Sequence, residues 1–146
     1  MAIDRTLDLR PGVLDIADNV DDILTILTPT ILNANDVTFS SDFEQYSSSA
    51  ANRVNIVKIA GMVFLSGAVK PKVEIPTGEH VIFTLPNSCK PTTDKYFVCQ
   101  GSQSNKYTLR IHSDTGEVTM SRYGTVSYLV CPVGAFLRIE SAYTIY

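Results

Sequence analysis

MVFLSGAV, residues 62–69, is the stretch of this 146-residue sequence that decides the fold. Its odd-numbered positions carry Val, Leu, Gly and Val, and its even-numbered positions carry Met, Phe, Ser and Ala. A period of two is typical of an extended strand, and apolar residues on both faces are typical of a strand inside a sheet. We therefore expect a central strand here, with a β-rich fold built around it.

The same period of two recurs toward the end of the chain. Residues 80–85, 106–112 and 137–145 each alternate between two faces. The turn signal Asp114-Thr115-Gly116 follows the second of these runs and predicts a hairpin. Prolines fall between the runs, where a missing amide donor costs no ladder hydrogen bond. Residues 54–146 are therefore expected to form an antiparallel β-sandwich or a jelly-roll-like head domain.

Two further parts precede this head. Residues 33–53 are rich in Ser, Asn and Asp, and they predict a linker or meandering loop tethered by Phe39, Phe43 and Tyr46. Residues 1–32 are expected to form an N-terminal arm and an oligomerising helix.

The helical part of residues 1–32 has apolar residues at alternating four- and three-residue steps. This spacing places them on one side of a short N-terminal α-helix. Pro29 disfavours helix at Thr28, so the regular helix is expected to end there. The apolar side, called the helix seam below, consists of Val13, Ile16, Ala17, Val20, Ile23, Leu24 and Leu27.

The helix seam has no helical partner inside the chain, because the rest of the sequence has β-periodicity. We therefore favour self-association over the alternative, in which a single amphipathic helix folds back on the sandwich. The mixture of Ile, Val and Leu favours a trimeric bundle, and hence a homotrimer, over a dimer. A helix of four to five turns is marginal alone, so the head is expected to share the trimer contacts.

Composition excludes several classes of partner. The net charge of −3 favours neither nucleic acid nor an anionic membrane. No apolar run approaches the ~20 residues of a membrane-spanning helix, so we expect no membrane insertion. Asp4 and Asp8 stand where a signal peptide would need a basic start and an apolar core, which favours assembly in a cytoplasm.

The three cysteines are not arranged as metal ligands. Cys89, Cys99 and Cys131 are an odd count without CxxC spacing, and we expect reduced thiols half-buried among strands. A Cys89–Cys99 disulfide is the alternative.

Catalytic motifs are missing from the sequence. The two histidines, His80 and His112, have no metal-ligand spacing, and no phosphate loop, nucleophile elbow or dinucleotide fingerprint is present. The carboxylates are scattered without the pairing that glycoside hydrolysis needs. The sequence therefore predicts no catalytic residue, no metal, no cofactor and no enzymatic activity.

One strand face nevertheless has the chemistry of a saccharide or anion site. Arg110 and His112 share a polar face, and tyrosines lie nearby in the sequence; aromatic rings stack on sugars while planar polar groups bind hydroxyls. The alternative is an ordinary solvated sheet face. The candidate saccharide-binding residues are Tyr107, Arg110, His112, Tyr123 and Tyr128.

The β-region also resembles a known family. Residues 53–69 have the pattern R…G-x-V-x-L-x-G-x-V, and residues 81–91 carry a leucine-proline step followed by a second proline. A hairpin with Ile111, Gly116 and Val118 then follows. These features, over residues 53–145, resemble the C-terminal β-domains of fibre, baseplate and receptor-binding proteins of tailed bacteriophages.

The resemblance implies a virion location after assembly in the host bacterial cytoplasm. It also implies a homotrimer, an N-terminal arm that docks to other virion proteins, and a head that contacts a host cell-surface glycan. The chain lacks extended shaft repeats. The leading hypothesis is a trimeric fibre or receptor-binding protein. One alternative is a purely structural protein, namely a head-fibre, decoration or baseplate-adaptor protein. The other alternative is a carbohydrate-active enzyme.

Overall fold

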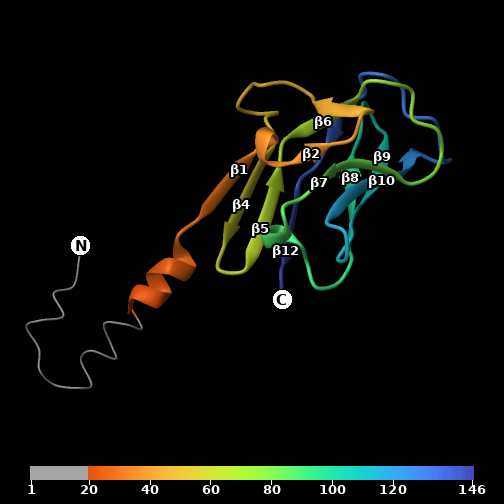
Figure 1. The fold of residues 1–146 in the computed structure, drawn as a ribbon. Coiled ribbons are helices and arrows are strands. Elements are labelled where there is room, and N and C mark those ends of the chain that lie inside the picture. The colour runs from red at the N-terminus through yellow and green to blue at the C-terminus, as the bar shows by residue number, and fades with distance from the viewer. Residues whose placement is uncertain (1–19) are drawn as a thin grey trace, which may run out of the picture.

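The computed structural model describes residues 20–146, and these residues form a mainly β fold with one short helix over residues 20–27 (Figure 1). Every pairing between the described strands is antiparallel. The prediction of a mainly β, antiparallel fold with a short N-terminal helix is confirmed.

Within the stretch MVFLSGAV, residues 62–66 form an inner strand of a four-stranded sheet. Within the described chain the strand order of this sheet is β1 (Thr30–Asn33), β4 (Asn55–Ile59), β5 (Met62–Ser66) and β12 (Ser141–Thr144). Strand β5 therefore lies between β4 and β12, which confirms the prediction of a central strand. Val63 and Leu65 point into the core, while Phe64 on the other face is 42% exposed.

Strand β5 continues into a second sheet through Gly67. Beyond this glycine the chain forms β6 (Ala68–Pro71), which lies between β11 (Leu137–Arg138) and β3 (Phe43–Gln45). The amide of Ile139 donates to the carbonyl of Gly67, and this bond bridges the ladders β11–β6 and β12–β5. The two sheets are thus joined along one pair of chain segments.

The third sheet has five strands among the described residues and carries the hairpin predicted at residues 114–116. Its order is β2 (Thr38–Phe39), β7 (His80–Thr84), β10 (Glu117–Gly124), β9 (Lys106–Ile111) and β8 (Lys95–Gln100). Short 3-10 turns occur at η1 (Ala34–Asp36) and η2 (Asn87–Cys89).

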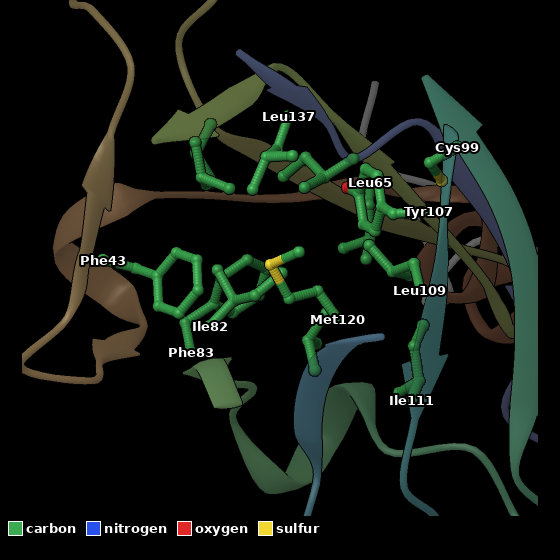
Figure 2. Close-up of a cluster of buried hydrophobic side chains, with 14 of the residues drawn as sticks. Phe43, Leu65, Ile82, Phe83, Cys99, Tyr107, Leu109, Ile111, Met120 and Leu137 are labelled. Carbon is green, nitrogen blue, oxygen red and sulfur yellow. The ribbon is translucent and has the colours of Figure 1, made fainter. Parts of the chain in front are cut away.

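A single cluster of buried side chains lies between these sheets (Figure 2). On β9 the predicted inward face is confirmed, since Tyr107, Leu109 and Ile111 are each at most 1% exposed. Figure 2 shows these side chains together with residues of other strands, including Leu65, Ile82, Phe83, Met120 and Leu137.

The predicted linker over residues 33–53 is wrong, because this segment belongs to the β-domain. Strand β2 pairs with β7, β3 pairs with β6, and Phe43 is only 2% exposed in the core. The domain also begins earlier than residue 54, because β1 extends the four-stranded sheet. The polar composition misled the prediction: these strands are two to four residues long and alternate with exposed Ser and Asn.

The helix ends where Pro29 predicts. Its last helical residue is 27, and the amide of Thr28 donates to the carbonyl of Leu24 over 3.0 Å. The helix does not fold back on the sheets: the side chains of Ile23, Leu24 and Leu27 are 51–56% exposed. The seam residues Val13, Ile16 and Ala17, and the arm before them, lie outside the described residues.

The cysteines are more deeply buried than predicted. Within the described chain Cys89, Cys99 and Cys131 are free thiols and all are buried. Burial raises the pKa of the Cys99 thiol to about 11 and that of the Cys131 thiol to about 12. The Cys89–Cys99 bridge is absent from the described structure.

Among residues 20–146, no helix has the length and apolar character needed to cross a membrane.

Candidate functional site

The five residues predicted to bind saccharide do not come together at one site. Tyr107 and Tyr123 are core residues with 1% and 4% exposure, and neither ring is available to a ligand at the surface. The Tyr107 hydroxyl donates to the carbonyl of Arg138 over 2.5 Å, and the Tyr123 hydroxyl accepts from the Asn105 amide over 3.2 Å. Proximity in sequence did not reveal that both rings face the core, although Tyr107 is among the residues that line the hollow beside Tyr128 described below.

Arg110 lies between two carboxylates. Its Nε and Nη2 donate to Asp94 Oδ2 over 3.1 and 2.6 Å, and its Nη1 donates to Glu79 over 3.2 and 3.3 Å. The guanidinium also lies over the ring of Tyr96, 5.4 Å from its centroid. Arg110 is therefore held by groups of its own chain.

His112 belongs to the same network. Its Nε2 lies 3.1 Å from Glu79 Oε1, and that carboxylate oxygen also accepts from the buried hydroxyl of Thr119 over 2.7 Å. Asp94 Oδ1 accepts from both the amide and the hydroxyl of Ser113. The network fastens the segments before β7 and β8 to the outer face of the five-stranded sheet.

Hydrogen bonds set the protonation of both carboxylates. The amide of Ser113, then the Arg110 guanidinium, lowers the pKa of Asp94 well below its ordinary value of 3.8. The hydroxyl of Thr119 is the main cause of a lowered pKa at Glu79, which burial opposes only in part. Hydrogen bonding to Asp94 raises the pKa of Arg110. All three groups are charged at neutral pH, so neither carboxylate is suited to act as a general acid there.

Tyr128 is the one predicted tyrosine that is exposed, with 64% of its surface free. The Arg122 guanidinium lies 5.9 Å from the centroid of its ring. Both residues border a surface hollow of about 180 Å³, called the Tyr128 hollow below, whose lining also includes Val98, Lys106, Thr108 and Ser127. Sequence reasoning missed Lys106 and Arg122 as members of a site.

A second exposed surface is apolar and lies on the outer face of the four-stranded sheet. The register aligns Ile31 with Val57, Val57 with Phe64, and Phe64 with Ala142. These four residues, called the apolar row below, cross all four strands. Ile31 is 68% exposed and follows Leu27 of the helix seam by four residues. The period-two pattern indicates an apolar outer face on β5, but the pairing that builds the row comes only from the fold.

Among residues 20–146, no group of three or more His, Cys, Asp or Glu side chains is placed to hold a metal ion.

Comparison with known proteins adds no relationship: no protein-family model and no curated protein sequence matches this chain.

Proposed function

We propose that this chain is a non-enzymatic structural protein of a tailed-phage virion, a trimeric fibre or receptor-binding protein that attaches to host surface saccharide. Three copies would form a helical bundle through the helix seam, below antiparallel β-sandwich heads. The N-terminal arm would dock to other virion proteins. The sequence resemblance over residues 53–145 is the basis for the virion setting.

The exposure of the helix carries the self-association part of the proposal. Ile23, Leu24, Ile26 and Leu27 are each more than half exposed in a single copy. Large exposed apolar surfaces mark interaction sites in soluble proteins. An isolated short helix is marginal in water, so packing against copies of itself would supply the stability it lacks.

The apolar row extends this argument to the head. Phe64 and Ile31 lie on a sheet face that no other described element covers. Packing of this face against a neighbouring copy would add the head contacts that a bundle of four turns requires. The association surface therefore includes both the helix seam and the apolar row.

Size-exclusion chromatography with light scattering tests the assembly. The full chain at micromolar concentration should have three times the mass of one chain, and Leu24→Asp should dissociate it because three charges would be buried at one layer. Thr25→Asp is the matched control, since it adds the same charge at the next position, off the seam. A wild-type protein that elutes as a monomer would contradict the proposal.

A glycan array tests attachment separately. The trimer should bind host surface saccharide, whereas a purely structural head-fibre or baseplate-adaptor protein would bind none while remaining trimeric. Incubation with host polysaccharide should release no reducing ends; release would instead indicate a carbohydrate-active enzyme.

A further inference from the structure

The Tyr128 hollow is built by a β-bulge in β10. Between Ser121 and Gly124 this strand advances three residues while β9 advances two, from Thr108 to Lys106. Arg122 and Tyr123 lie within this step, and the φ of Arg122, 56°, is in the left-handed region. Bulges re-aim side chains, and such backbone strain in a non-glycine residue is concentrated at functional positions.

The loop after the bulge folds back toward β10 and positions Tyr128. The amide of Leu129 donates to the carbonyl of Tyr123 over 2.7 Å. Gly124 has φ 143°, and a Cβ at this position would collide with the carbonyl of Ser127. A tight turn of this kind places the Tyr128 ring next to the Arg122 guanidinium, 5.9 Å away.

The charged side chains that line the Tyr128 hollow are all positive. Lys106 and Arg122 both line it, and no acidic residue of the described chain does. This contrasts with the net charge of −3 of the whole sequence and with Arg110, which two carboxylates neutralise. Arg110 lies four residues from Lys106 along β9, a separation of ~13 Å, so the two features are distinct.

We infer that the Tyr128 hollow is a subsite for an anionic saccharide; this inference rests on the proposed attachment function. The ring of Tyr128 offers an apolar surface to one sugar face, and the hydroxyls of Thr108 and Ser127 can exchange hydrogen bonds with sugar hydroxyls. Lys106 and Arg122 bind the negative group, either a carboxylate or a sulfate ester.

The size of the hollow fits one sugar ring. Its volume of about 180 Å³ is smaller than the ~300–1,000 Å³ of pockets for drug-sized ligands. Because the hollow is open, a longer saccharide can extend beyond it while one charged residue occupies the subsite. The inference therefore predicts recognition of a single acidic ring within a chain.

Isothermal titration of the full-length protein tests the inference with three probes: a galacturonate trisaccharide, a sulfated trisaccharide and the carboxyl-reduced, neutral counterpart of the first. At least one acidic probe should bind at least tenfold more tightly than the neutral one, and added salt should reduce the difference. Lys106→Gln and Arg122→Asn should each weaken that binding about tenfold, since charge-assisted hydrogen bonds have this magnitude. Asparagine tolerates the left-handed backbone at position 122.

Lys95→Gln is the matched control, because Lys95 lies at the other end of the β8–β9 ladder; it should bind the acidic probe as the wild type does. Tyr128→Ala should weaken the acidic and neutral probes by similar factors. Binding of neutral saccharide alone, or acidic binding that neither cation variant weakens, would overturn this inference and leave the proposed attachment intact. A glycan array with no binding at all would overturn the attachment function itself.

Discussion

At the residue scale, Asp94 is the carboxyl group whose pKa the fold lowers most among the described residues. It accepts four hydrogen bonds from Ser113 and Arg110, and these bonds lower its pKa. In the unfolded chain the carboxylate keeps its ordinary value of 3.8 and therefore binds a proton at higher pH than in the fold. The fold also lowers the pKa of Glu79 from its ordinary value of 4.5.

This difference predicts how stability depends on pH. Because both folded pKa values are lowered, the free energy of unfolding should be constant near neutral pH and should fall as the pH drops below about 4.5. Asp94→Asn should lower stability at pH 7 and make the acid decline shallower. Urea denaturation at pH 7, 5, 4 and 3 measures both effects.

Glu44→Gln is the control for this pH series. Glu44 pairs with Lys70 at the surface over 3.3 Å and accepts no buried hydrogen bond, so its loss should leave the acid decline unchanged. Parallel pH curves for Asp94→Asn and the wild type would contradict the network argument.

The same residues show where sequence reasoning stops. Alternation along β9 correctly placed Tyr107 inside and Arg110 outside, because a strand has only two faces. It did not reveal that Glu79 and Asp94, 31 and 16 residues upstream of Arg110, close around the guanidinium. Such pairs depend on loop paths that no local pattern specifies.

At the element scale, Gly67 determines how β5 passes into β6. Its φ is 108°, and a Cβ there would overlap the carbonyl oxygen of Arg53. A neighbouring backbone group cannot move as a side chain can. Gly67→Ala should therefore reduce the free energy of unfolding by about 3 kcal/mol or more, measured by chemical denaturation.

Gly134 provides the matched comparison. Its φ of 71° is also left-handed, but nothing lies within 4 Å of the position a Cβ would take. Gly134→Ala should cost only the backbone strain, about 1–2 kcal/mol. Equal losses in the two variants would show that the close approach to Arg53 has no effect on stability.

Elements were predictable in proportion to their length and periodicity. The runs at 62–69, 80–85 and 106–112 formed strands, and Pro29 ended the helix as expected. The segment 33–53 failed because its strands are short and gain their stability from pairing with β6 and β7. The sequence also did not predict the bulge at Arg122, because a bulge is defined by the register of β10 against β9.

At the scale of the whole molecule, the described chain exposes two outward sheet faces of different character. The outer face of the five-stranded sheet carries the network of Arg110 and the Tyr128 hollow. The outer face of the four-stranded sheet carries the apolar row. The proposed function assigns ligand contact to the first face and association to the second.

One pair of substitutions distinguishes the proposed roles of the two sheet faces. Phe64 and Val98 are both exposed apolar strand residues, at 42% and 76%, on the association face and the ligand face respectively. Phe64→Asp should weaken the trimer at least tenfold, because three carboxylates would be buried between heads. Val98→Asp should leave the mass unchanged in light scattering across a dilution series, although Val98 is the more exposed of the two side chains. If Val98→Asp dissociated the trimer and Phe64→Asp did not, the association surface would lie on the five-stranded sheet. The Tyr128 hollow would then be buried between copies.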